Sequence, residues 1–153
     1  MERMVYMSVK KCLIIGLGIF LTKASWAQEM PRMELNAGLF RIEVEVAANN
    51  QNRMRGLMFR KNMPSNQGML FVFTQNERHC MWMKNTFLPL SVAFLDDKGV
   101  ILNIEDMMPQ TEENHCAVDK ARFALEMNQG WFTQKGIKAG ARISGIERAP
   151  RPQ

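Results

Sequence analysis

Gly68-Met-Leu-Phe-Val-Phe-Thr74 is a continuous apolar run in the middle of this 153-residue chain. A run of this length, bounded by polar segments, is typical of a strand buried in the centre of a sheet. The rest of the chain is interpreted around this central strand.

Strands with one polar face lie on either side of it in the sequence. From Leu39 to Val46, apolar and charged residues alternate, which predicts a half-buried antiparallel strand. Ala121 to Met127 alternates in the same way. There we expect three large apolar residues to point inward (Phe123, Leu125, Met127) and the other side chains to point outward (Arg122, Ala124, Glu126).

The remaining segments complete a mainly β fold. Further strands are expected at 79–84, 91–95, 100–104 and 141–147, with a hairpin turn at Asp96-Asp97-Lys98-Gly99. Short helices are expected at 51–58, capped by Asn49 or Asn50, and at 129–135. About seven strands and two short helices therefore predict a mainly β (α+β) fold, either a curled antiparallel or mixed sheet or a half-open barrel.

The first 27 residues have the features of a secretory signal peptide. Basic residues precede the apolar run 12–21, and Ser25-Trp26-Ala27 supplies small residues at the positions that cleavage requires. The apolar run is too short to cross a bilayer, which takes about 20 residues. We therefore expect cleavage after Ala27, a periplasmic or secreted protein, and no stable membrane span in the mature chain.

Residues 28–153 are expected to form a single domain with its core at 35–147. The formal net charge is +5, but much of it lies in the leader, where four basic residues accompany a single Glu2. The mature chain is close to neutral and its basic residues are scattered, so nucleic acid is not an expected partner. The sequence leaves the oligomeric state open.

Several motifs resemble domain-of-unknown-function family 192. They include Arg55-Gly-Leu-Met-Phe-Arg60, the central run, Trp82-Met-Lys-Asn-Thr86 and Phe94-Leu-Asp96, within a match from about Leu35 to Ile146. The resemblance implies a compact, mostly β single domain that is often exported. It implies no activity, because the family has none assigned.

Two cysteines remain after export, and each of the two histidines directly precedes one of them. Cys80 and Cys116 form an even pair in an oxidising compartment, which favours a disulfide if their Cα atoms lie within about 7 Å. The alternative is a soft-metal site for Cu(I) on one strand face, formed by His79, Met81 and Met83. No other cofactor is expected.

The segment around Trp82 is the strongest candidate for a binding surface. An aromatic platform beside a cation and hydrogen-bonding groups suits a small polar or anionic ligand. The candidate ligand-binding residues are Trp82, Lys84, Asn85, Thr86, Arg55 and Asp96. Alternatively, Trp82 belongs to the core, and Asn85 and Thr86 complete a turn.

No motif with a known catalytic mechanism is present, so no catalytic residue is assigned. The sequence favours an exported protein that binds a small ligand without catalysis or acts as an accessory protein of the cell envelope. The alternatives are a periplasmic Cu(I)-binding protein and an enzyme with an unrecognised site.

Overall fold

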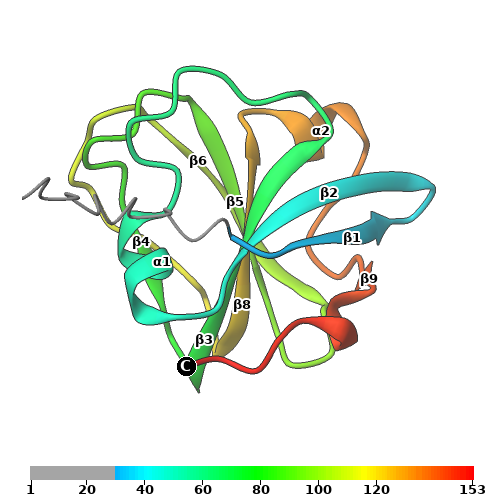
Figure 1. Ribbon diagram of the computed structural model, residues 1–153. Helices are drawn as coiled ribbons and strands as arrows, with labels where there is room; N and C mark the ends of the chain where they lie inside the picture. The colour runs from blue at the N-terminus through cyan, green and yellow to red at the C-terminus, as the bar shows by residue number, and fades with distance from the viewer. Residues whose placement is uncertain (1–29) are drawn as a thin grey trace, which may run out of the picture.

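The computed structural model describes residues 30–153, so the predicted signal peptide lies outside the described residues. Seven strands form one sheet in the order β6-β5-β8-β3-β2-β1-β9 (Figure 1). Their bounds are β1 Arg32–Ala37, β2 Phe40–Ala47, β3 Gln67–Glu77, β5 Leu90–Leu95, β6 Ile101–Met107, β8 Ala121–Asn128 and β9 Ile143–Ser144. A separate ribbon pairs β4 (Cys80–Met81) with β7 (His115–Cys116). The helices are α1 (Asn50–Arg55), α2 (Trp131–Gln134) and the 3₁₀ turn η1 (Ile146–Arg148).

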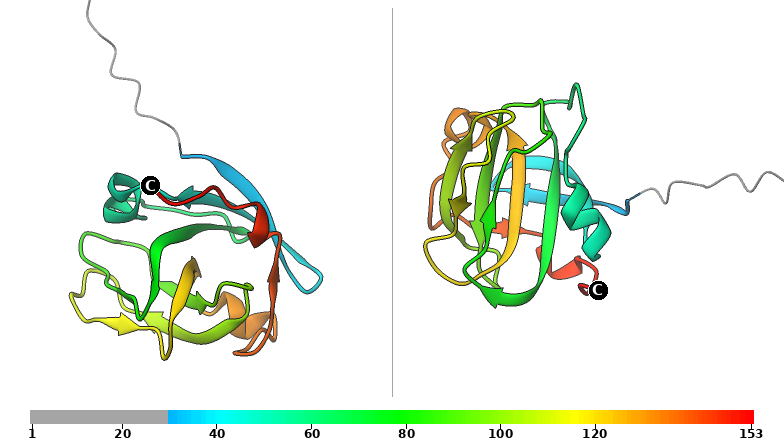
Figure 2. Two further views of the ribbon diagram at one scale, coloured as in Figure 1. Left: turned by 90° about the horizontal axis from the view of Figure 1, so that it is seen from below. Right: turned by 90° about the vertical axis from the view of Figure 1, so that its left-hand side faces the viewer.

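The large sheet is mixed and curls into a half-barrel (Figure 2), as the sequence predicts. β2 and β3 run parallel, and the other neighbouring strands run antiparallel. The two edges of the sheet meet at one end, where the amide of Ile101 donates to the carbonyl of Ala141 at 2.9 Å and that of Ile143 donates to Gly99 at 2.8 Å. The barrel is therefore closed at this end only.

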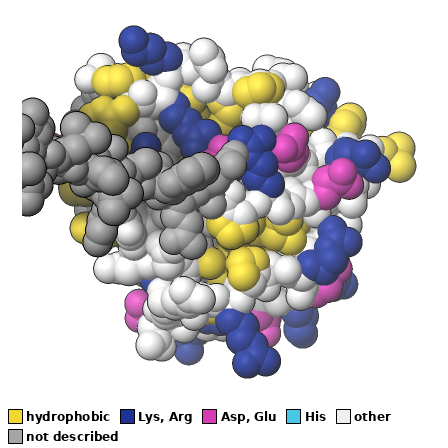
Figure 3. Space-filling model, in the orientation of Figure 1, with side chains coloured by type: hydrophobic (Ala, Val, Ile, Leu, Met, Phe, Trp, Pro, Cys, Tyr) yellow, Lys and Arg dark blue, Asp and Glu magenta, His cyan; other side chains and the backbone are white. Residues whose placement is uncertain are grey.

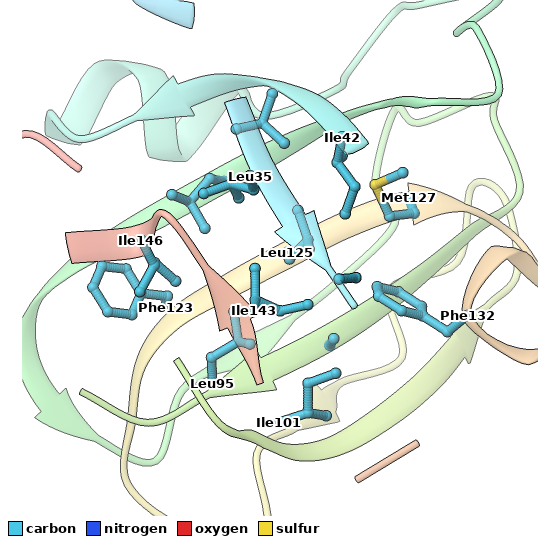
Figure 4. Packing of buried hydrophobic residues seen from close by; sticks show 14 of the residues in the cluster. Leu35, Ile42, Leu95, Ile101, Phe123, Leu125, Met127, Phe132, Ile143 and Ile146 are labelled. Carbon is cyan, nitrogen blue, oxygen red and sulfur yellow. The ribbon is translucent and has the colours of Figure 1, made fainter. Parts of the chain in front are cut away.

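The inside of the curl is filled by the main hydrophobic core (Figure 4). In the strands where apolar and polar residues alternate, every second residue points into this core. Ile42, Val44 and Val46 of β2 are examples, and each is at most 1% exposed. The opposite face of β2 is partly exposed at Glu43 and Glu45, which form ion pairs with Arg32, and is buried at Ala47. On the face seen in Figure 3, Lys and Arg are scattered among Asp and Glu.

A second core covers the outer face of β3, β5 and β8. Leu70 and Val72 of β3 point into the barrel, whereas Met69, Phe71 and Phe73 point into this outer core. Both faces of β3 are therefore dry, which is the physical reason for the continuous apolar run at 68–74.

The outer core also corrects the prediction for β8. Phe123, Leu125 and Met127 point into the barrel as expected, but Ala124 and Glu126 are buried as well. The alternation of β8 marks its barrel face and gives no sign that a second layer covers the other face.

Four predicted elements are shorter than expected. The strand predicted at 141–147 is only Ile143–Ser144, with a 3₁₀ turn after it at Ile146–Arg148, and the helix predicted at 129–135 is Trp131–Gln134. The strand predicted at 79–84 is only Cys80–Met81, because the chain turns at Lys84-Asn85 and buries Met83. The helix predicted to reach Met58 ends at Arg55, because Gly56 takes φ 47° and ψ −136°, a conformation that only glycine adopts readily. Among the described helices, none has the length and hydrophobicity to span a membrane.

Candidate functional site

A cavity of about 610 Å³ opens on the outer face of the sheet. We call it the outer pocket. α1 and the residues after it form one wall, the segment 79–86 forms the other, and β3 and β8 form the base. Its apolar lining is Met54, Leu57, Met58, Phe71, Phe73, Met81 and Trp82.

Glu126 places a carboxyl group in this apolar lining. Its cross-strand partners on the same face, Met69 and Val92, are fully buried, and Glu126 itself is 4% exposed. Within residues 30–153 no hydrogen-bond donor or cation contacts the carboxyl. Burial without a partner disfavours the charged form and raises the pKa of Glu126 to about 8.

The α1 wall brings two arginines to the pocket. Asn49 caps the helix by accepting from the Asn52 amide at 2.8 Å. The Arg53 guanidinium donates to three carbonyl oxygens, those of Ala48 (2.6 Å), Val72 (3.1 Å) and Gln153 (2.8 Å). Arg55 is exposed and makes no hydrogen bond or close ion pair with any described residue. The hydrogen bond from Arg60 lowers the pKa of Glu45, and the charge of Arg55 adds to this lowering from a greater distance. Arg53 is therefore structural, and Arg55 is available to a ligand.

The opposite wall is held by the β4–β7 ribbon. The Sγ atoms of Cys80 and Cys116 lie at disulfide distance, 2.00 Å, and the Cα atoms are 4.0 Å apart, which meets the requirement that the sequence left open. His79 stacks on Phe73 with ring centroids 3.7 Å apart, and its Nε2 lies 2.9 Å from the carbonyl oxygen of Gln75. These contacts fix the wall against the sheet.

A tight turn follows the ribbon and ends at Thr86. The Thr86 amide donates to the Met83 carbonyl at 3.0 Å, and Asn85 has a positive φ of 56°. The Asn85 carbonyl accepts from the amide of Phe59, which also has a positive φ, of 64°. For a bulky side chain such a φ is uncommon and strained, so the two turns hold each other in place.

The structure brings only some of the predicted ligand-binding residues together. Trp82, Thr86 and Arg55 line the outer pocket. Lys84 and Asn85 are not part of the lining; Lys84 pairs with Glu112 at 3.3 Å and lies over the Trp82 ring. Asp96 lies in the β5–β6 hairpin, where its carboxylate accepts from the amides of Lys98 and Val100, so its role there is to stabilise the turn.

The residues predicted for Cu(I) are also divided. His79 and Met81 line the pocket, but Met83 is fully buried in the outer core, because the strand ends before it. The described part of the chain has no cluster of three or more His, Cys, Asp or Glu side chains that could hold a metal. A Cu(I) site stays a prediction that would need thioether ligands.

Glu126 is the residue that the sequence interpretation missed. Its place in an alternating strand suggested a solvated carboxylate. Two signals could have identified it: its neighbour on the same face is the small apolar Ala124, and the apolar run 68–74 implies a strand that is covered on both sides. A charged residue on a doubly covered sheet is rare enough to mark a candidate site.

The solved structures that are similar to this chain include those of two proteins. A proposed transcription regulator from Sinorhizobium meliloti 1021 is 31% identical, with a TM-score of 0.73, over 77% of this chain and 96% of that one. A protein of unknown function from Novosphingobium aromaticivorans DSM 12444 is 26% identical, with a TM-score of 0.71, over 77% of this chain and 88% of that one. No curated protein matches the chain. The family model of DUF192 (Uncharacterized ACR, COG1430) matches residues 33–145, in agreement with the motifs in the sequence, and the chain therefore belongs to this family.

Proposed function

We propose that this protein is an exported, non-catalytic binder of a small ligand, which it holds in the outer pocket. The observation that carries the proposal is a cavity of about 610 Å³ with a mixed apolar and polar lining, which contains one buried carboxyl with no hydrogen-bond or ion-pair partner in the described chain. Small-ligand sites typically have volumes of about 300–1,000 Å³, mostly apolar linings and a few placed polar groups.

Two features support a binding role over a catalytic one. Glu126 is the only carboxylate of the pocket lining, and the lining holds no serine, lysine or free thiol. Its hydroxyls are those of Thr74 and Thr86. The Thr86 hydroxyl donates to the Lys84 carbonyl, the His79 ring bonds to the Gln75 carbonyl, and neither hydroxyl is paired with a base among the described residues. Cys80 is in the disulfide. The pocket therefore supplies recognition groups without an evident nucleophile and base pair.

Export is part of the proposal and rests on the sequence of residues 1–27. A cysteine pair at disulfide distance is in keeping with an oxidising compartment, where disulfides persist. The proposed site of action is therefore the periplasm or the exterior of the cell.

Binding of the neutral fluorescent probe N-phenyl-1-naphthylamine to the mature protein tests the pocket. We expect saturable binding of one probe per chain. Met58→Trp places an indole in the pocket and should weaken binding about tenfold or more, which corresponds to at least about 1.4 kcal/mol.

The matched control is Met108→Trp, because Met108 is 63% exposed and is not part of the pocket lining. This variant should bind the probe like the wild type. Absence of saturable binding in the wild type, or equal weakening in both variants, would show that the outer pocket is not a ligand site.

A further inference from the structure

None of the described elements around Glu126 supplies the hydrogen-bond donor or cation that a buried carboxyl requires. β3 and β5 present Met69, Phe71 and Val92 to it, all of them apolar. The ionisable groups of the other walls are Arg53 and Arg55 of α1 and His79 before β4, and none of them contacts the carboxyl. Buried polar groups are almost always hydrogen-bonded, so the Glu126 carboxyl has to find its partner in the pocket, in water or in a ligand. Its oxygens are not among the solvent-inaccessible side-chain atoms of residues 30–153 that lack a partner, so the pocket gives access to them.

The surroundings of the carboxyl favour a cation as that partner. The pocket lining includes the aromatic side chains Phe71, Phe73 and Trp82, and ring faces attract organic cations. One face of Phe73 is covered by His79 and one face of Trp82 by the Lys84 ammonium, so Phe71, next to Glu126 on the sheet, is the ring that remains for a ligand cation. A carboxylate away from water also attracts an opposite charge more strongly than an exposed one does. A carboxylate ligand would meet like charge at Glu126 unless that group stayed protonated.

Resting on the proposed function, we infer that the ligand of the outer pocket is an organic ammonium compound, whose ammonium group pairs with Glu126 while its apolar part fills the cavity. The sequence suggested a small polar or anionic ligand, and this inference departs from the anionic alternative. Lys84, on which that expectation depended, is paired with Glu112 outside the pocket lining.

Binding of the ammonium is coupled to loss of a proton. In the empty pocket at neutral pH Glu126 is mostly protonated, because burial raises its pKa to about 8. The incoming ammonium stabilises the carboxylate, so one proton passes from Glu126 to solvent and the ion pair forms. Affinity should therefore rise nearly tenfold per pH unit up to about pH 8 and level off above it.

A six-carbon series tests the inference: hexylammonium, hexan-1-ol and hexanoate, each titrated by calorimetry and by displacement of N-phenyl-1-naphthylamine at pH 6, 7 and 8. Hexylammonium should bind at least about tenfold more tightly than hexanol at pH 8 and lose this advantage toward pH 6. Titration at pH 7 in two buffers of different ionisation enthalpy should give a release of about one proton per ligand.

Glu126→Gln should abolish the preference for the ammonium, whereas the matched control Glu112→Gln, which removes an exposed carboxylate, should retain it. The pH profile and the proton release are measured on the wild type, so they do not depend on the folding of either variant. Equal affinity for the three compounds would overturn the inference and leave the pocket in place. Tighter binding of hexanoate than of hexylammonium would also overturn the inference. If the wild type bound neither the fluorescent probe nor any of the three compounds, the proposed function would be refuted as well.

Discussion

At the residue scale, Glu126 is the residue whose ionisable side chain fits its buried surroundings least. Its strand is central, both of its cross-strand partners are fully buried, and its carboxyl has no partner within residues 30–153. Burial of a carboxyl without a hydrogen-bond partner costs free energy even when the group is protonated, and more when it is ionised. Because Glu126 does not stabilise the fold, its presence here indicates a role in function.

Glu126 should make the protein less stable as the pH rises. The folded-state pKa of about 8 lies above the value of 4.5 for the unfolded chain, so between these values the folded state holds one proton more. The free energy of unfolding should then fall by up to about 1.4 kcal/mol per pH unit from pH 5 to pH 8 and change little above that. Urea unfolding at a series of pH values measures this slope.

Glu126→Gln should remove the slope in that window, and the variant should be more stable than the wild type at pH 8. Glu45 does not interfere, because the hydrogen bonds from Arg60 lower its pKa and its contribution is lost only at acidic pH. Parallel stability curves for the wild type and Glu126→Gln would mean that Glu126 is paired or hydrated in solution.

Lys84 should matter to neither stability nor pocket binding. Its side chain is 44% exposed, and exposed ion pairs such as Lys84–Glu112 contribute about 0–1 kcal/mol. Lys84→Ala should therefore shift the unfolding free energy by less than about 1 kcal/mol and leave the dissociation constant of N-phenyl-1-naphthylamine unchanged. A large loss of probe affinity would place Lys84 in the site after all.

Sequence patterns predicted the inward residues of β8 but not the environment of Glu126. The two-residue period of a strand places Phe123, Leu125 and Met127 on one face, and this period can be recognised in the sequence of the strand itself. What covers the other face depends on α1 and on the segment 79–86, which approach β8 from far away in the sequence. A pocket between such segments is a tertiary property that no local pattern contains.

At the scale of elements, the β4–β7 ribbon is the part that fixes one wall of the pocket. It has only two residue pairs, Cys80 with Cys116 and Met81 with His115. Such a short pairing is not stable alone, and the cysteine pair holds it. The sequence predicted a longer strand here because His79 to Lys84 alternates, but the pairing ends at Met81 and the chain turns at Lys84-Asn85, where Asn85 has a positive φ.

Removal of the cysteine pair should cost about 4 kcal/mol, since it spans 36 residues and closes a loop of that size in the unfolded chain. The double variant Cys80→Ala, Cys116→Ala should unfold at correspondingly lower urea and bind N-phenyl-1-naphthylamine more weakly, because the ribbon lines the pocket. Thiol alkylation followed by intact mass checks the premise: two alkyl groups should be added after reduction and none before it.

At the scale of the whole molecule, the proposed export predicts that the mature chain begins after Ala27. Protein isolated from the periplasm or the medium should have the intact mass of residues 28–153, with Gln28 at its N-terminus. A Ser25→Arg, Ala27→Arg variant should stay unprocessed, because the cleavage site needs small residues at these positions. Protein that begins at Met1 in the cytoplasm would contradict the proposed localisation.

The curled sheet depends on the closure of its edges at one end, near Gly99. This glycine has a φ of 79°, and a Cβ there would lie 2.6 Å from the carbonyl oxygen of Ile143 in β9. Gly99→Ala should thus push β9 away from the start of β6 and expose the inner core. Gly136 is the matched control, since its φ is 68° but nothing lies within 4 Å of its Cβ position.

Both alanine variants carry the backbone strain of a positive φ, about 1–2 kcal/mol, but only Gly99→Ala carries the clash. We therefore expect it to be less stable than Gly136→Ala by a further 1–3 kcal/mol, roughly the cost of overpacking. Hydrogen exchange locates the effect: the Ile143 amide, which donates to Gly99 at 2.8 Å, should lose protection. If the two variants were equally stable and the Ile143 amide stayed protected, β9 would be able to shift without opening the barrel. The closed end would then contribute little to the curl of the sheet, on whose outer face the pocket lies.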